Sequence, residues 1–310
     1  IGFAITRRLL AQGWNVVATD RTTGDWPADL GAPRPELRVL SMDVRNDADV
    51  RAAAREAGPV DLLVNNAGIA VFGTQEESDL ASVHDMFDVN VLGSARVTQA
   101  LLPALRASRG TVVQISSLAG KAVFPESGFY AATKHAVEAM AEALIQETAP
   151  LGLRVRLVEP GNYATRLQQT AAAASGEVPP DSPYAALRPV WDARRESVLQ
   201  TPGDPDEVAE ALVASLDQPD RFLRVVVGPD AQDILGLRRG IGGDAFVQLS
   251  IERNGGPAGT HGRAHVLTPG EVLAAAPDEL GPTRAALRHG HLDHWAETDK
   301  GRRALARLES

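Results

Sequence analysis

Residues 60–68 read Val-Asp-Leu-Leu-Val-Asn-Asn-Ala-Gly, an apolar run that passes directly into a turn of small and polar residues. The same order recurs further along the chain. Residues 111–117 read Thr-Val-Val-Gln-Ile-Ser-Ser, and residues 153–161 read Leu-Arg-Val-Arg-Leu-Val-Glu-Pro-Gly. Apolar runs of five or six residues are typical of strands that helices cover on both faces. These segments therefore predict a parallel β-sheet.

Segments with helical periodicity separate the predicted strands. The predicted helices cover residues 1–12, 48–57, 80–108 (one or two helices), 128–149 and 205–216. The predicted strands cover residues 14–19, 37–42, 60–64, 111–115, 153–158 and 223–227. This alternation is typical of an α/β fold with a doubly wound parallel sheet. We assign residues 1–253 to this domain and residues 254–310, which begin in a Gly- and Pro-rich stretch, to a C-terminal extension of unknown role.

The composition excludes several classes of protein. The 310 residues carry a net charge of -9, which argues against a nucleic-acid partner or an anionic membrane surface. No apolar run of the sequence approaches the length that crosses a bilayer. The absence of cysteine excludes disulfides and thiolate chemistry and suits a reducing compartment. We therefore expect a cytoplasmic protein with no membrane partner.

Unusual residues follow five of the predicted strands. In chain order they are Asp20, Asp43, the turn 65–68, the pair 116–117 and the pair 160–161. Ligands of doubly wound sheets bind at the carboxyl ends of the strands. Five such positions in succession predict one ligand site along this edge of the sheet.

Tyr130-Ala-Ala-Thr-Lys134 lies in the predicted helix 128–149. A spacing of four places the phenol and the ammonium on one helix face, about 6 Å apart along the axis. A free tyrosine has a pKa of about 10, and a nearby cation favours its phenolate. The alternative is a Tyr and a Lys that share a solvated helix surface by chance. Because the sequence has only three Tyr and three Lys, a chance Tyr-x-x-x-Lys spacing is expected roughly 3% of the time. We interpret the pair as an acid–base device, with Ser117 donating a hydrogen bond to a substrate oxygen.

Together these features resemble the short-chain dehydrogenase/reductase family over roughly residues 1–240. The matching positions are Asp43-Val44, Asn65 to Gly68, Asn90, Ser117 thirteen residues before Tyr130, Lys134, and Pro160-Gly161 with Thr165. The resemblance implies a Rossmann fold and an NAD(P)-dependent oxidoreductase that acts on an alcohol or carbonyl group. The runs 158–163 and 227–231 are similar to the hydroxysteroid and retinol dehydrogenase branch.

The resemblance also implies a role for each matching residue. Tyr130 is the acid and base, Ser117 orients the substrate, and Lys134 lowers the pKa of the phenol and binds the ribose. Asn90 holds a water in a proton relay that reaches Lys134. The implied cofactor contacts are Gly2, Asp20, Arg21, Asp43, Val44, Asn66, Ala67, Gly68, Tyr130, Lys134, Pro160, Gly161 and Thr165. Relatives commonly pair through two long helices, here near residues 90–108 and 128–149, so we expect a homodimer or homotetramer.

The expected cofactor is NAD. The carboxylate of Asp20 can accept both ribose hydroxyl protons and would repel a 2′-phosphate. The adjacent Arg21 softens this exclusion, so NADP stays open as the alternative. In relatives the residue at Asp43 accepts from the adenine amino group, Pro160 and Gly161 line the nicotinamide pocket, and Thr165 bonds the carboxamide.

Two features depart from the family pattern. Ile1-Gly2 is similar to only the end of the family's glycine-rich turn, and the strand before that turn would be the middle one of the sheet. We therefore expect the natural polypeptide to begin further upstream, and this chain alone to have poor stability and weak cofactor binding. The stretch 289–294 reads His-Gly-His-Leu-Asp-His, the spacing of the metallo-β-lactamase zinc motif, with His261 and His265 as further nitrogens. A helical pattern precedes it and only 16 residues follow, so we expect a solvated helix end and no metal.

The substrate region is expected in residues 162–201, where relatives keep a mobile lid. Its candidate apolar lining residues are Tyr163, Leu167, Tyr184, Leu187 and Trp191, joined by Val123, Phe124 and Phe129 from the loop before Tyr130. This lining favours a small apolar alcohol or ketone. Two alternatives are a cofactor-binding regulatory protein on the same scaffold and an inactive fragment.

Overall fold

The computed structural model describes residues 1–22, 30, 35–167, 171, 181–256, 272–273, 295–296 and 299–309. The chain divides into two compact units. Unit 1 comprises Ile1–Pro180 and Glu196–Ala231, and unit 2 comprises Asp181–Arg195 and Gln232–Ser310. The predicted division between a catalytic domain and an extension at residue 253 stays a prediction.

Unit 1 contains six parallel strands among its described residues, in two ladders. They are β1 (Val16–Asp20), β2 (Leu37–Ser41), β3 (Leu62–Asn65), β4 (Thr111–Ile115), β5 (Arg154–Pro160) and β6 (Phe222–Val227). β1 pairs with β2, and β3 to β6 pair in chain order. Every pairing is parallel. Each strand begins and ends within two residues of its predicted range, and the α/β doubly wound prediction is confirmed.

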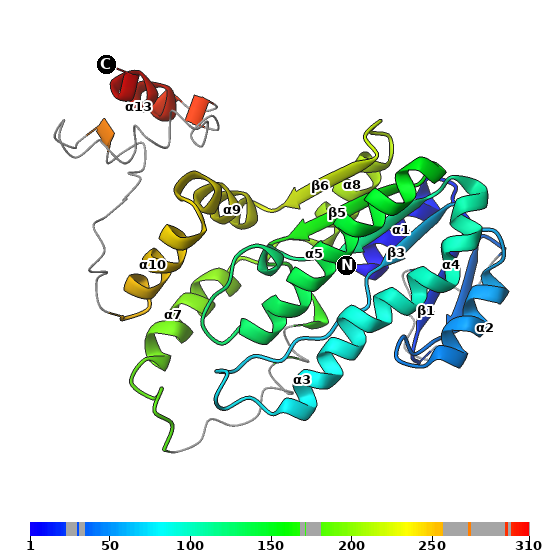
Figure 1. Cartoon of the computed structure of the whole chain (residues 1–310), viewed down its shortest axis with the longest axis horizontal. Coiled ribbons are helices and arrows are strands. Elements are labelled where there is room, and N and C mark those ends of the chain that lie inside the picture. The colour runs from blue at the N-terminus through cyan, green and yellow to red at the C-terminus, as the bar shows by residue number, and fades with distance from the viewer. Residues whose placement is uncertain are drawn as a thin grey trace. The chain divides into compact units, whose positions relative to one another are not determined.

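Helices cover both faces of the sheet (Figure 1). They are α1 (Gly2–Ala11), α2 (Asp47–Ala57), α3 (Leu80–Phe87), α4 (Ser94–Ser108), α5 (Gly128–Thr148) and α8 (Pro205–Leu216), with short turns η2 (Asp88–Gly93), η3 (Leu118–Gly120) and η4 (Ala149–Leu151). Apolar residues of α2, α4 and α5 pack on one face, and those of α1 and α8 pack on the other. The side chains of β4 alternate between these cores, with Val112 in the first and Val113 in the second.

Local signals in the sequence fix the helix ends. Asn46 begins α2, where its side chain accepts from the backbone N–H groups of Ala48 and Asp49. Gly58 ends α2 at a φ of 78°, a backbone conformation that residues other than glycine rarely adopt. Asp204 caps α8, and Pro205 occupies the first turn, where no backbone donor is needed.

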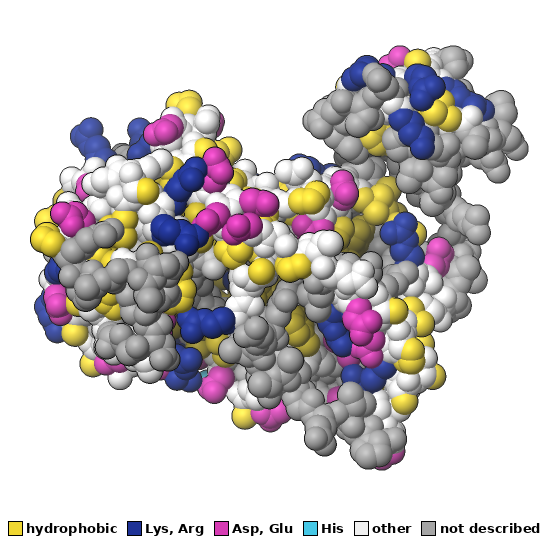
Figure 2. Space-filling view, turned by 180° about the vertical axis from the view of Figure 1, so that it is seen from behind, with side chains coloured by type: hydrophobic (Ala, Val, Ile, Leu, Met, Phe, Trp, Pro, Cys, Tyr) yellow, Lys and Arg dark blue, Asp and Glu magenta, His cyan; other side chains and the backbone are white. Residues whose placement is uncertain are grey.

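Ion pairs join α1 to α8 across one side of unit 1. Arg7 pairs with Asp206 at 2.5 Å, and Arg8 pairs with Glu210 at 3.0 Å. Figure 2 shows that Lys and Arg side chains are interspersed with Asp and Glu side chains among the described residues of that view. Exposed pairs of this kind contribute about 1 kcal/mol or less each, so the apolar cores carry most of the stability.

Among the described residues, the chain after β5 contains four helices besides α8. They are α7 (Arg188–Leu199), α9 (Pro229–Ile241), α10 (Gly243–Arg253) and α13 (Asp299–Glu309). The sequence analysis did not assign α9 and α10, because glycines at 236, 240, 242 and 243 interrupt the helical pattern. The stretch 289–294, His261 and His265 lie outside the described residues. Within the described part of the chain, no helix is long and apolar enough to cross a membrane, and no cluster of metal-ligating side chains occurs.

Candidate active site

A cavity of about 1590 Å³ in unit 1 includes the carboxyl ends of the strands in its lining. The structure brings Ser117 and every residue expected to contact the cofactor to its wall: Gly2, Asp20, Arg21, Asp43, Val44, Asn66, Ala67, Gly68, Tyr130, Lys134, Pro160, Gly161 and Thr165. The cavity also extends between β1 and β3, which do not pair with each other among the described residues. That is where the sequence analysis expects a further strand.

Ser117, Tyr130 and Lys134 meet at this cavity. Ser117 follows β4, while Tyr130 and Lys134 lie one turn apart on α5 and are 7% and 6% exposed. Ser117 Oγ accepts from the backbone N–H of Ala119 at 3.1 Å, and the Ser117 hydroxyl lies near enough to Tyr130 to lower the pKa of the phenol. The Nζ of Lys134 lies 5.8 Å from the centroid of the Tyr130 ring and donates to the carbonyl of Ile115 at 3.0 Å. A hydroxyl, a phenol and an ammonium are therefore held together on one wall.

Burial dominates the protonation of both groups on α5. It raises the pKa of Tyr130 to about 12, against the hydrogen bond from Ser117, which lowers it. It also lowers the pKa of Lys134 to about 8, against the charge of Glu138, which raises it. The sequence predicted a lowered pKa for the phenol. The groups of this chain raise it instead, so that prediction is wrong. The cost of burying a phenolate exceeds the stabilisation that Ser117 gives to it.

Asn90 does not line the cavity but lies behind it, in the π-helical turn η2. Its Oδ1 accepts from the backbone N–H of Ile69 at 2.8 Å, and its Nδ2 donates to the carbonyl of Ile69 at 2.9 Å and to Thr133 Oγ1 at 3.0 Å. A Cβ added at Gly68 would lie 3.3 Å from Asn90 Oδ1 and 3.8 Å from Lys134 Nζ. Asn90 thus fixes the turn after β3 to α5, beside Lys134. Local π-helical turns are frequent at functional sites.

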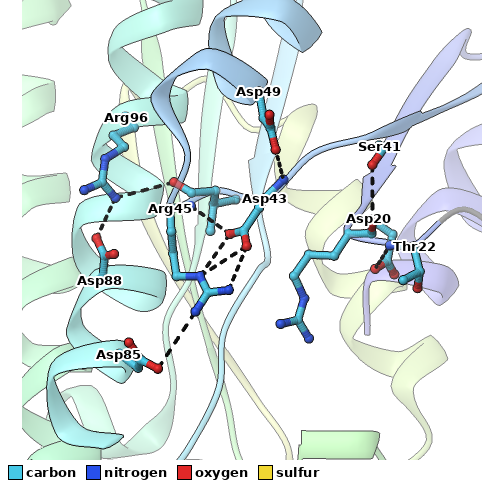
Figure 3. A network of polar contacts seen from close by, with 11 residues as sticks. Asp20, Thr22, Ser41, Asp43, Arg45, Asp49, Asp85, Asp88 and Arg96 are labelled. Atoms are coloured by element: carbon cyan, nitrogen blue, oxygen red, sulfur yellow. Dashed lines mark hydrogen bonds and ion pairs between the residues drawn. The ribbon is translucent and has the colours of Figure 1, made fainter. Parts of the chain in front are cut away.

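The far end of the cavity carries mixed charges (Figure 3). Asp20 ends β1, and its Oδ1 accepts from the backbone N–H of Thr22 at 3.4 Å. The carboxylate of Asp43 accepts from Arg45, with 2.7 Å to Nη2 and 2.9 Å to the backbone nitrogen. These bonds lower the pKa of Asp43 to about 2, and the charge of Arg21 lowers it further. The sequence analysis missed Arg45, because an Asp-x-Arg spacing outside a regular element gives no signal.

The segment after β5 is anchored by a residue that the sequence analysis also missed. Asp230 Oδ2 accepts from the backbone N–H of Asn162 at 2.8 Å. A Cβ added at Gly161 would lie 2.0 Å from Asp230 Oδ1, so glycine is required there for this approach. Tyr163 donates to Glu207 on α8 at 3.1 Å. The run 227–231 was the available signal, but it indicated a resemblance and no role.

The lining residues fit a nicotinamide dinucleotide. A Cβ added at Gly2 would lie 2.7 Å from Asn66 Nδ2, so the first turn of α1 can approach the turn after β3 closely. A helix N-terminus beside such a turn presents backbone N–H groups suited to phosphate oxygens. Asp20 offers a carboxylate to ribose hydroxyls at one end, and Tyr130 and Lys134 lie at the other.

The parallel sheet, the cavity at its carboxyl edge and the buried phenol–ammonium pair define a dinucleotide-dependent oxidoreductase. The chain belongs to the short chain dehydrogenase family, whose model matches residues 1–176. An uncharacterised oxidoreductase of Schizosaccharomyces pombe is 30% identical over 225 residues, which are 70% of this chain and 92% of that protein. The family resemblance found in the sequence is thereby confirmed.

Solved structures agree with this assignment. A short-chain dehydrogenase from Streptomyces avermitilis has a TM-score of 0.67 and 33% identity, covering 82% of this chain and 95% of that one. A family member from Burkholderia phymatum in complex with NAD has a TM-score of 0.63 and 25% identity, covering 84% and 93%. A serine dehydrogenase complexed with NADP+ has a TM-score of 0.62 and 26% identity, covering 74% and 91%. The protein is an NAD(P)-dependent dehydrogenase or reductase.

Proposed function

We propose that this enzyme transfers a hydride between NAD(P) and the secondary alcohol or ketone of a small apolar molecule, and that Tyr130 transfers the accompanying proton. One observation carries the proposal. The Tyr130 phenol lies beside the Ser117 hydroxyl and the Lys134 ammonium on the wall of the cavity. A proton donor, an orienting hydroxyl and a cation are the groups that carbonyl reduction requires.

The bound nicotinamide supplies or accepts the hydride, and the residues of the chain handle the substrate oxygen and its proton. Ser117 donates a hydrogen bond that holds this oxygen beside the phenol. In reduction, Tyr130 gives its proton to the oxygen, and in oxidation it takes the proton back. A phenol with a pKa of about 12 is protonated at neutral pH, which suits the donor role in ketone reduction.

Apolar side chains around Tyr130 support an apolar substrate. Phe72 meets the Tyr130 ring edge-on, with the centroids 5.8 Å apart and the planes at 70°. Ile69, Phe129 and Leu167 are partly buried in the same cluster. Such a surface favours the hydrocarbon part of a ketone over the hydroxyls of a sugar. Residues 168–170 and 172–180 of the expected lid lie outside the described residues.

Asp20 supports NAD as the preferred form of the cofactor. Its carboxylate stands at the end of β1, where the ribose of a dinucleotide lies in this fold. Arg21 and Arg45 bring positive charge to the same end of the cavity, which weakens the exclusion of a 2′-phosphate.

The test is a screen of secondary alcohols and ketones, read by the absorbance of the reduced nicotinamide. Tyr130→Phe should lower kcat about 10²–10⁴-fold, the usual contribution of a positioned acid–base group. The affinity for NADH, measured by fluorescence titration, should be nearly unchanged, because the phenyl ring remains. Lys134→Met should also lose turnover, whereas the matched exposed variant Lys300→Met should not.

Retention of turnover by Tyr130→Phe would reject the assignment of the proton to Tyr130. A wild-type protein that binds NADH but turns over none of the compounds would favour the cofactor-binding regulatory alternative.

A further inference from the structure

A group of charged residues built around two buried carboxyls takes no part in the mechanism proposed above. We call it the ion cluster, and it consists of Lys121, Glu138, Glu142, Glu159 and Arg224. Its members come from the turn after η3, from α5, from β5 and from β6. Glu138 and Glu159 are each 2% exposed, which is rare for carboxyl groups.

Glu138 is a buried carboxylate that contacts both cations of the cluster. Its Oε2 lies 3.1 Å from Lys121 Nζ and 3.4 Å from Arg224 Nε. The half-exposed Glu142 pairs with Arg224 and lies 3.7 Å from Lys121 Nζ. Glu159 Oε1 lies 3.2 Å from Arg224 Nε. Two cations therefore flank Glu138 Oε2, while Glu159 faces one cation that it shares with two other carboxyls.

The charges and hydrogen bonds of the ion cluster are incomplete without a further proton. Among the described residues, its three carboxyls face two cations. Glu138 Oε1 and the buried Oγ of Ser116 have no hydrogen-bond partner, and Glu159 Oε1 has only the ion pair with Arg224, which does not have hydrogen-bond geometry. Two neighbouring carboxylates that are both ionised repel each other. One proton shared between them removes this repulsion and lets one carboxyl donate a hydrogen bond to the other. Burial and the charge of Glu138 accordingly raise the pKa of Glu159 to about 7.

We propose that Glu138 and Glu159 share one proton, and that the ionised Glu138 is a positioning residue that keeps Lys134 charged in the active site. The second part rests on the proposed function of Lys134. Glu138 follows Lys134 by one turn of α5, and its charge opposes the effect of burial on the ammonium. Lys121 and Arg224 thus keep Glu138 ionised, and Glu138 in turn stabilises the charge of Lys134.

The shared proton can be tested without catalysis, by infrared difference spectroscopy of the whole protein between pH 5 and pH 9. We expect a protonated-carboxyl band that shifts in D₂O and disappears as the pH rises through the neutral range. Glu159→Gln should remove the band, and the half-exposed control Glu142→Gln should keep it. The absence of such a band in the wild-type protein, or its survival in Glu159→Gln, would overturn the shared proton. Neither result depends on whether Tyr130 is the acid–base group.

The effect on Lys134 is tested by the pH profile of kcat/KM. Glu138→Gln should move the alkaline limb about one pH unit toward acid, because Lys134 loses the charge that stabilises its ammonium. Glu142→Gln and Glu159→Gln should leave the limb in place, since both keep Glu138 ionised. Glu138→Asp retains the charge and should restore the wild-type limb.

A uniform loss of activity in Glu138→Gln with an unmoved limb would show a structural role only and overturn the positioning role. If Glu138→Gln does not fold, Glu138→Asp decides, because a displaced limb in that variant would likewise overturn it. Failure of the proposed function itself is recognised separately, by turnover in Tyr130→Phe.

Discussion

Arg156 on β5 is fully buried, and its removal should destabilise the fold more than any change at the protein surface. Its Nε donates to the carbonyl of Ser215 at 2.8 Å, Nη1 to that of Asp220 at 2.8 Å, and Nη2 to that of Gln218 at 2.9 Å. One guanidinium thus pairs the carbonyls at the end of α8 and in the loop that leads to β6. Arg156→Met keeps much of the buried volume but removes all three donors.

The magnitude follows from what the variant leaves unpaired. A buried carbonyl without a donor costs about 1–3 kcal/mol. That cost applies in full to Ser215, a buried residue, and in part to the exposed residues Gln218 and Asp220, whose carbonyls can turn to water. Relief from burying the guanidinium offsets some of the loss, so we expect a net cost of about 2–4 kcal/mol. For a domain of this size that corresponds to a Tm lower by roughly 4–16 °C.

Urea unfolding followed by circular dichroism measures this difference. Arg154→Met is the matched control, because Arg154 points from the same strand and makes a single bond of 3.2 Å, to the carbonyl of Leu216. We expect the control to cost less than about 1 kcal/mol. An Arg156→Met protein as stable as the control would refute the reasoning. It would show that water or a shift of the loop satisfies these carbonyls at no cost.

Three further predictions concern the cavity. Asp43→Asn removes a carboxyl whose pKa Arg45 lowers to about 2. Such a group stabilises the fold above its unfolded pKa of about 4 and loses this contribution as the pH falls, so the difference in urea midpoint from wild type should shrink below about pH 4. A difference independent of pH would contradict this. Asp20→Ser should lower the ratio of kcat/KM for NAD over NADP by about tenfold or more, and an unchanged ratio would remove Asp20 from cofactor selection. Gly161→Ala places a Cβ 2.0 Å from a carboxylate oxygen and should raise the KM for the cofactor with the fold retained. Gly236→Ala is the control, because a Cβ added at Gly236 has no other atom within 4 Å, and this variant should bind the cofactor normally. Equal KM values for the two variants would refute a role for the contact between Gly161 and Asp230.

The strands of the sheet could be predicted from the sequence, because strands that helices cover on both faces appear as continuous apolar runs. The run 111–115 is buried at every position, and its predicted bounds match β4. The site residues followed from the same property, since parallel strands that end in polar residues bring those residues to one edge. Tyr130 and Lys134 needed only the helical repeat to be placed on one face.

Contacts between distant elements were not visible in the sequence. The approach of Asp230 to Gly161 depends on how α9 begins beside β5. The meeting of Glu138 and Glu159 depends on α5 packing over the sheet. The direction of the Tyr130 shift was also misjudged, because spacing shows that an ammonium is near but not how much water the fold removes.

Burial moves the two titrating groups of the site in opposite directions, because it penalises the charged form of each. In an unfolded chain Tyr and Lys have nearly equal pKa values of about 10. In the folded site the pKa of Tyr130 is about 12 and that of Lys134 is about 8, so the ammonium has become the stronger acid. A phenolate formed after proton transfer to a substrate would therefore take a proton from the lysine downhill. The carboxylate of Glu138 limits how far the lysine pKa falls, and so keeps this second proton in place at neutral pH.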